Sequence, residues 1–433
     1  MRLATALRIV RELAVRDGDG MSKRGVRQLV EAIPRADARP FARHVLRDVA
    51  RYLSVPRGVG GQAAERAHLA AQWLMRAQAV TEDGGLSYGY FPLRQADGWR
   101  SSYPETTGYT VPTLLQYGLR FDRPEAVQTA LRMASFVVSA QMPSGALYGG
   151  TSRTTDERVA VAFNTGMGLM GLLAAYRHTG DAAFSGAARR AAEFLVDDIG
   201  EDGYFRSHGR NVHQHQVKTY TCLCAWPLYE AGRELAEPGF CAAAVRVGDA
   251  TLRVQQANGW FAHNCLSRRP YAPLLHTIGY TLQGLAELGV ASGHGRFVDA
   301  ARRGVQPLLP YCEHGFVYAR WFDDWQPAAF SSCLVGAAQV AVVCYRLGEL
   351  TGEARYRRAA DGVVNFLKAV QPTASTSGLE REVVGALGGS FPLFGAYMPN
   401  GYPGWATKFF LDALLQQHAL QLAAVAPPIA VQA

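Results

Sequence analysis

The chain of 433 residues is 48% hydrophobic and carries a formal net charge of +8, so it has enough apolar material for a large core and only a modest basic excess. No run of 18 apolar residues occurs, and we therefore expect no transmembrane helix. The modest charge does not by itself predict a nucleic-acid partner, and we expect none. The seven cysteines lack zinc-site spacing, and their odd number indicates reduced thiols in a cytoplasmic protein, with no metal and no cofactor.

Residues 1–60 precede the repeating part of the chain and are predicted to form a helical extension. Leu3, Leu7, Val10 and Leu13 fall on one face of a helix, while arginines occupy the rest of its circumference. A helix of this kind most often packs on its own domain. The alternative is a helix that contacts a partner or lies peripherally on the inner membrane.

From residue 61 onward, two kinds of helix alternate. Amphipathic segments have apolar residues at i, i+3, i+4 and i+7, whereas the segments between them are apolar around most of their circumference. The amphipathic segments are predicted over residues 63–78, 125–141, 184–199, 241–256, 296–309 and 353–371. The apolar segments are predicted over residues 102–118, 163–181, 219–235, 276–289, 331–350 and 404–417.

The apolar segments repeat at a fixed spacing. The markers Tyr109, Thr165, Thr221, Thr277 and Cys333 each lie 56 residues after the one before, and a sixth, Thr407, follows after a longer loop. A fixed period indicates repeated architecture. Six helical hairpins, with apolar helices inside and amphipathic helices outside, predict an all-α fold, the (α/α)6 toroid, over residues 61–433.

In such a ring the amino-terminal ends of the inner helices lie at one end, together with the loops that carry glycine and aromatic residues. Unpaired backbone N–H groups and aligned helix dipoles make that end suitable for an anion. Aromatic, cationic and carboxylate side chains in the same loops are typical of a carbohydrate site. For proton transfer we select Glu105, Tyr109, Tyr220 and His276. For substrate binding we select Arg100, Tyr103, Arg153, Asp156, Asn164, His213, His215, Lys218, Tyr280, Trp321, Tyr397 and Tyr402.

Each of these residues also has a structural interpretation. Glu105, Asp156 and Asn164 could cap their own helices, and tyrosines at helix starts often belong to the core. His276 could be a hydrogen-bonded core histidine. His213 and His215 without an evident third ligand are weak evidence for a metal site.

Short motifs resemble known families. The segment FNTGMGLMGLLAAYRHTGD from Phe163 resembles the helical domain of D-glucuronyl C5-epimerases, whose β-sandwich portion has no counterpart here. The segments YPETTGY (103–109) and GSFPLFGAYMPNGYPGWATKFF (389–410) resemble uncharacterised toroid proteins of bacterial polysaccharide-biosynthesis clusters. Related toroids include polysaccharide lyases, unsaturated uronyl hydrolases and N-acylglucosamine epimerases. The resemblance implies a carbohydrate-active toroid over roughly residues 62–420.

The leading hypothesis is an enzyme that epimerises or cleaves an anionic, uronate-bearing oligosaccharide or polysaccharide. A base would remove the proton next to the carboxylate, and Arg100, Arg153 and Lys218 would hold the anion. A glycoside hydrolase is the first alternative, with Glu105 paired with Asp156 or Asp323. The others are an isoprenoid cyclase or prenyltransferase, for which no acidic cluster is evident, and a glycan-binding protein without activity.

Overall fold

The structure is a computed structural model. It describes Ala14 and residues 20–32, 34–35, 39–54, 61–93, 98–153, 157–210, 216–266, 272–374 and 381–425. The predicted amphipathic face of Leu3, Leu7, Val10 and Leu13 lies outside these ranges.

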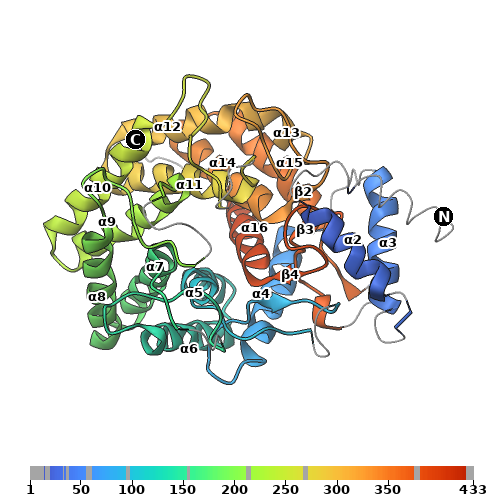
Figure 1. Cartoon of the computed structure of the whole chain (residues 1–433), viewed down its shortest axis with the longest axis horizontal. Helices are drawn as coiled ribbons and strands as arrows, with labels where there is room; N and C mark the ends of the chain where they lie inside the picture. The colour runs from blue at the N-terminus through green and yellow to red at the C-terminus, as the bar shows by residue number, and fades with distance from the viewer. Residues whose placement is uncertain are drawn as a thin grey trace.

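Two concentric layers of helices form a ring, as the period predicted (Figure 1). The inner helices are α5 (Pro104–Arg120), α7 (Ala162–Thr179), α9 (Ala225–Glu234), α11 (Leu275–Ser292), α14 (Leu334–Thr351) and α16 (Gly404–Val425). The outer helices are α4 (Ala63–Ala79), α6 (Pro124–Ala140), α8 (Ala182–Asp198), α10 (Pro238–Arg253), α12 (Gly295–Val305) and α15 (Ala354–Val370). A 3₁₀ turn, Thr219–Cys224, leads into α9, and the short α13 (Leu309–Glu313) follows α12. The prediction of an all-α toroid is confirmed.

The inner helices are buried because the outer layer and the neighbouring inner helices surround them. Helix α14 illustrates this, since it is the one helix in the described ranges that is long and apolar enough to cross a membrane, yet 72% of it is buried inside the ring. A continuous apolar circumference is what a helix in the centre of a toroid requires. All seven cysteines fall within the described ranges, and none forms a disulfide.

A glycine turn after each outer helix docks that hairpin on the next one. The six glycines have φ between 82° and 89°, where a side chain is strained: Gly84, Gly145, Gly203, Gly259, Gly315 and Gly385. A Cβ at Gly145 or Gly259 would collide with the backbone carbonyl of Arg190 or Arg303 in the following outer helix. A Cβ at Gly385 would likewise collide with the backbone carbonyl of Leu69 in α4, so the last hairpin docks on the first.

Glutamines at the ends of outer helices reinforce this docking. The Gln141 amide donates to the carbonyls of Gly145 and Ala187, both at 2.9 Å, and so ties its own turn to α8. Gln255 bonds Gly259 and Ala300 in the same way. Because each glutamine bonds both its own turn and the next outer helix, these side chains fix the rotation from one hairpin to the next.

Threonines in the first turn of several inner helices hold the preceding loop. The Thr165 hydroxyl accepts from the Leu147 amide at 2.8 Å, and Thr407 accepts from Leu387 at 2.9 Å. In the first hairpin the equivalent residue is Thr107, which accepts from Leu86, and not the sequence marker Tyr109. The markers at Thr165 and Thr407 therefore reflect a structural hydrogen bond.

Short strands join distant parts of the ring. Strand β1 (Gly89–Tyr90) pairs antiparallel with β4 (Tyr402–Pro403), so the first loop is hydrogen-bonded to the last. Strand β2 (Ser332–Cys333) pairs antiparallel with β3 (Ser390–Phe391). Both pairs lie beside the start of an inner helix, and they order the backbone at this end of the ring.

The extension forms helices α2 (Met21–Ala32) and α3 (Arg39–Ser54), which lie beside the β3 and β4 segments (Figure 1). Tyr52 of α3 places its ring 6.0 Å from those of Phe330 and Phe391, and its hydroxyl donates to the Phe330 carbonyl at 3.0 Å. The described part of the extension therefore packs on the toroid.

Replacing Gly259 by Ala should destabilise the protein more than replacing Gly293 by Ala. Both glycines have positive φ, but a Cβ at Gly293 meets no atom within 4 Å. Gly293→Ala should cost about 1 kcal/mol from backbone strain alone. Gly259→Ala should cost a further 1–3 kcal/mol, roughly, because its Cβ overlaps the Arg303 carbonyl. Urea unfolding midpoints of the two variants measure the difference, and equal losses would contradict docking through this turn.

Candidate active site

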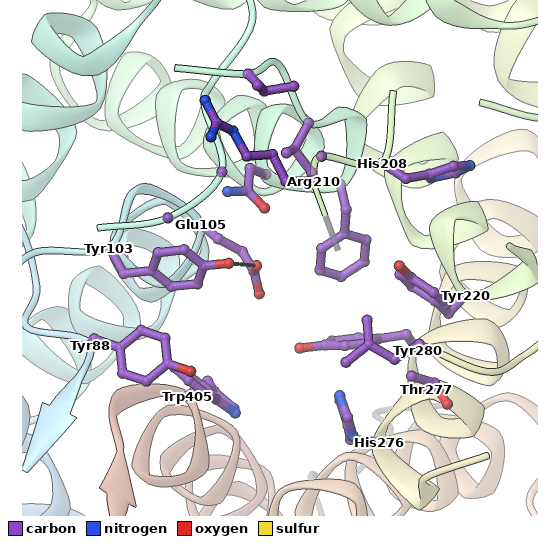
Figure 2. Close-up of a pocket in the computed structure, with 18 of the residues that line it drawn as sticks. Tyr88, Tyr103, Glu105, His208, Arg210, Tyr220, His276, Thr277, Tyr280 and Trp405 are labelled. Carbon is purple, nitrogen blue, oxygen red and sulfur yellow. Dashed lines mark hydrogen bonds between the residues drawn. The ribbon is translucent and has the colours of Figure 1, made fainter. Parts of the chain in front are cut away.

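A cavity of about 440 Å³ opens where the inner helices begin. The first turns of α5, α7 and α11, the 3₁₀ turn before α9 and the segment leading into α16 all contribute to it (Figure 2). Its aromatic wall consists of Tyr88, Tyr103, Phe163, Tyr220, Tyr280, Tyr397 and Trp405. Its other polar side chains are Glu105, Glu157, Asn164, His208, Arg210, His276 and Thr277. The predicted convergence of helix starts thus produces a real concavity.

Glu105 is half-buried in the cavity wall and is held by two tyrosines. The Tyr103 hydroxyl donates to Oε2 at 2.8 Å, and the Tyr109 hydroxyl reaches Oε1 at 3.5 Å. Burial raises the pKa of Glu105 to about 7, against these two hydrogen bonds, which favour the ionised form. Both bonds come from tyrosine hydroxyls and neither from the amides of α5. The carboxyl group is thus placed to exchange a proton near neutral pH.

The tyrosines around Glu105 remain protonated. Burial, followed by the charges of neighbouring groups, raises the pKa of Tyr103, Tyr109, Tyr220 and Tyr280 above the usual value for a phenol. A buried phenol with a raised pKa donates a hydrogen bond but is a poor base. Tyr109 and Tyr220 were predicted to transfer protons, and this environment suits them to donating rather than abstracting one.

His276 lies on the opposite side of the cavity from Glu105 (Figure 2). Its ring is 3% exposed and stands 4.5 Å from the Tyr397 ring. Burial, assisted by the charge of Arg320, lowers the pKa of His276 to about 3. Within the described residues its Nδ1 has no hydrogen-bond partner. A neutral imidazole with an unused nitrogen can bind a hydroxyl group or carry a proton.

A second buried histidine, His208, also lines the cavity wall. His208 is 7% exposed, and burial lowers its pKa. Beside it, Arg210 is exposed and donates to the Glu157 carbonyl at 2.6 Å. Arg210 is the cation that lines the cavity within the described ranges.

The structure brings together seven of the predicted residues in the cavity wall: Tyr103, Glu105, Asn164, Tyr220, His276, Tyr280 and Tyr397. Tyr109 does not line the cavity itself. Its hydroxyl lies 3.5 Å from Oε1 of Glu105, which does line it. Asn164 does not cap its helix, since Val161 occupies the N-cap position. Instead, the Asn164 amide donates to the Tyr148 carbonyl at 2.8 Å and so holds the second loop.

The three cations predicted to hold an anion do not line the cavity. The backbone of Arg100 is paired with Gly89, and Arg153 is exposed on a turn. Lys218 is 2% exposed, and its ammonium group donates to the Cys265 carbonyl at 2.6 Å. The structure therefore gives Lys218 a role in holding a loop.

Two predicted aromatic residues also lie elsewhere. Trp321 is fully buried against Tyr311, with ring centroids 4.8 Å apart. The Tyr402 hydroxyl lies 3.2 Å from Nε2 of His44 in the extension. Asp323, an alternative acid, is exposed and does not line the cavity. The predicted residues Asp156, His213 and His215 are outside the described residues.

Sequence reasoning did not select Tyr88, Trp405, His208, Arg210, Glu157 or Met398, all of which line the cavity. Trp405 had a signal, because it stands in the first turn of α16 as Glu105 does in α5. The Trp405 indole donates to the Tyr397 hydroxyl at 2.9 Å. The others come from loops whose paths the sequence pattern does not specify. Nowhere in the described ranges do three His, Cys, Asp or Glu side chains gather as metal ligands.

No protein-family model matches the chain, and no curated protein sequence matches it. Solved structures do. An unsaturated glucuronyl hydrolase specific for heparin superimposes with a TM-score of 0.65 at 16% identity, over 83% of this chain and 98% of that one. Cellobiose 2-epimerase from Bacillus thermoamylovorans B4167 gives 0.63 at 11% identity, over 80% and 95% of the two chains. A D-mannose isomerase gives 0.60 at 11% identity, over 82% and 96%. These likenesses establish the shared toroid fold.

Replacing Glu105 by Gln should stabilise the fold at pH 8. A pKa raised from 4.5 to about 7 means that the folded state retains a proton between these values that the unfolded state releases. Stability then falls as the pH rises through that interval, by at most on the order of 3 kcal/mol. The amide of Gln carries no charge, so the gain should be present at pH 8 and absent at pH 4.

Unfolding midpoints at both pH values measure this effect. Glu193→Gln, at an exposed position of α8, is the matched control and should change neither midpoint. A Glu105→Gln variant that is less stable than the parent at pH 8 would show that the carboxylate is not strained by burial.

Proposed function

We propose that this protein is an enzyme that moves a proton on an anionic, uronate-bearing glycan, by epimerisation or elimination. The observation that carries the proposal is the carboxyl group of Glu105, whose pKa burial raises to about 7 in the wall of an aromatic cavity. Aromatic rings accommodate the C–H faces of a sugar. The toroid fold is shared with enzymes named as a glucuronyl hydrolase, an epimerase and an isomerase, and this supports a carbohydrate substrate.

In this mechanism the ionised Glu105 removes the C5 proton beside the substrate carboxylate. The protonated hydroxyls of Tyr103, Tyr220 and Tyr280 surround the site, and the starts of the inner helices add favourable potential for the developing enolate. Returning a proton to the opposite face completes an epimerisation. In an elimination, the C4–O bond breaks, and the departing oxygen takes up a proton. The second proton comes from a protonated tyrosine hydroxyl of the wall, such as that of Tyr220, while neutral His276 binds a sugar hydroxyl.

Arg210 in the cavity wall and the starts of the inner helices support a negatively charged substrate. Guanidinium groups bind carboxylates through two parallel hydrogen bonds. We therefore assign the substrate carboxylate to the Arg210 side of the cavity. We propose a cytoplasmic location, in keeping with seven cysteines that form no disulfide.

Hydrolysis of an unsaturated uronyl glycan is a second candidate, and one observation favours it. With a pKa of about 7, Glu105 is half protonated near neutral pH and can donate a proton to an enol ether. Ordinary glycoside hydrolysis uses two carboxyl groups. Of the described residues, Glu157 is the other carboxylate of the cavity wall, and it is exposed. The cavity wall therefore fits hydrolysis of an unsaturated uronyl glycan by one acid better than ordinary glycoside hydrolysis by two carboxyl groups.

The pH dependence of kcat/KM should separate the two candidates. If Glu105 acts first as a base, kcat/KM rises through about pH 7 and then levels off. If it acts as an acid, kcat/KM falls through the same pH. His276 stays neutral above pH 4 and should add no inflection between pH 5 and 9. Activity independent of pH from 5 to 9 would contradict a role for Glu105 in either direction.

The reaction itself is identified by incubation with a panel of saturated and unsaturated uronate glycans in deuterated water. Deuterium at C5 indicates epimerisation, new ultraviolet absorbance indicates elimination, and loss of that absorbance from an unsaturated glycan indicates hydrolysis. Glu105→Gln should lower turnover at least 100-fold, since general acid–base catalysis contributes roughly 10²–10⁴. Glu193→Gln should retain activity. Binding of these glycans with no turnover would favour a glycan-binding protein instead.

A further inference from the structure

One wall of the cavity is built by the segment 390–403, which connects β3 to β4. Tyr397 and Met398, at its middle, both line the cavity. Within the segment, the Ser390 hydroxyl donates to the Tyr397 carbonyl at 2.7 Å and accepts from the Tyr397 amide at 2.9 Å. The Ala396 amide donates to the Ser331 hydroxyl at 3.0 Å. The position of the Tyr397 ring therefore depends on the path of this segment.

The segment adopts backbone conformations that need external support. Met398 and Asn400 have φ of 46° and 58°, and neither is glycine. Such residues persist only where the surroundings determine the backbone, and they are concentrated at ligand sites. The Asn400 amide closes the segment by donating to the Leu393 carbonyl at 2.7 Å.

That support comes from the N-terminal extension. Asp48 of α3 is 4% exposed, and its Oδ2 accepts from the Leu393 amide at 2.9 Å. The Asn400 side chain donates to the Gly25 carbonyl of α2 at 2.8 Å. Gly25 permits this approach, because a Cβ there would stand 2.7 Å from both the Phe394 carbonyl oxygen and the Pro399 Cβ. Two tethers from the extension thus hold the two ends of the Leu393–Asn400 loop.

We propose that the extension is a working part of the cavity, in which Asp48 and the Gly25 backbone position Tyr397 and Met398. Asp48 is a positioning residue, because it acts through the Leu393 amide and does not line the cavity. The position of the cavity wall can be tested without substrate, and only the expected change in kcat/KM rests on the proposed function.

The test compares Asp48→Ala with Asp48→Asn in the full-length chain, by amide hydrogen exchange without substrate. Alanine leaves the Leu393 amide without its acceptor, whereas the carbonyl of Asn can replace it. Exchange over residues 390–403 should be at least tenfold faster in Asp48→Ala and return towards the parent rate in Asp48→Asn. Exchange in α14 should be unchanged. Glu31→Gln, which removes only an exposed ion pair with Arg27, is the control within α2 and should have no effect.

Asn400→Gly provides an independent variant if Asp48→Ala does not fold. Glycine tolerates the positive φ of this position but removes the bond to Gly25. It too should accelerate exchange over 390–403. The fluorescence of Trp405, taken as the difference from a Trp405→Phe background, should shift in both variants because its indole bonds the Tyr397 hydroxyl.

Two results would overturn the proposal. One is unchanged exchange over 390–403 in both Asp48→Ala and Asn400→Gly. The other is a uniform acceleration across α14 and the segment, which would mean that the extension only adds global stability. If the proposed function holds, Asp48→Ala should also lower kcat/KM and Asp48→Asn restore it, with the pH midpoint unmoved. Because hydrogen exchange is measured without substrate, it tests the proposal even if the protein shows no activity on the glycans assayed.

Discussion

The close docking of each glycine turn on the next outer helix is the constraint on which the rest of the structure depends. At Gly145, Gly259 and Gly385 there is no room for a side chain between the turn and the neighbouring backbone. Glutamines such as Gln141 and Gln255 bond across the same junction. Repeating one junction around the chain fixes one rotation per hairpin, and the last turn meets α4. The inner helices must then all begin at the same end, and only this common end can form a shared cavity.

Burial at that end acts on acids and bases in opposite directions. It raises the pKa of Glu105 to about 7 and lowers that of His276 to about 3. The same apolar walls therefore leave one group poised to exchange a proton near neutral pH and keep the other neutral. The hydroxyls of Tyr103 and Tyr109 moderate the effect on Glu105. The cavity wall therefore combines a carboxyl group whose pKa lies near neutral pH with a histidine that stays neutral.

The segment 390–403 closes the ring, contacts the N-terminal extension and lines the cavity. Strand β4 pairs with β1 and closes the ring, while β3 pairs with β2 at the fifth hairpin. Between β3 and β4 the chain is hydrogen-bonded to α2 and α3, and its Tyr397 lines the cavity. The spacing before the sixth marker, Thr407, is longer than the others, and the segment that makes both contacts lies within it. The break in the 56-residue period thus falls where the chain forms the part of the wall that carries Tyr397 and Met398.

The sequence by itself determined the ring and the positions nearest its axis. The alternation of amphipathic and apolar helices requires two layers, and residues in or just before the first turn of an inner helix, such as Glu105, Asn164 and His276, must lie at the common end. Only the tertiary structure decided which loop side chains enter the cavity. Lys218 turns to the Cys265 carbonyl and Tyr402 to His44, whereas Tyr88 and His208 face inward. Helix periodicity fixes a direction for each side chain, but a loop takes its path from hydrogen bonds to distant segments, and these exist only once the chain has folded.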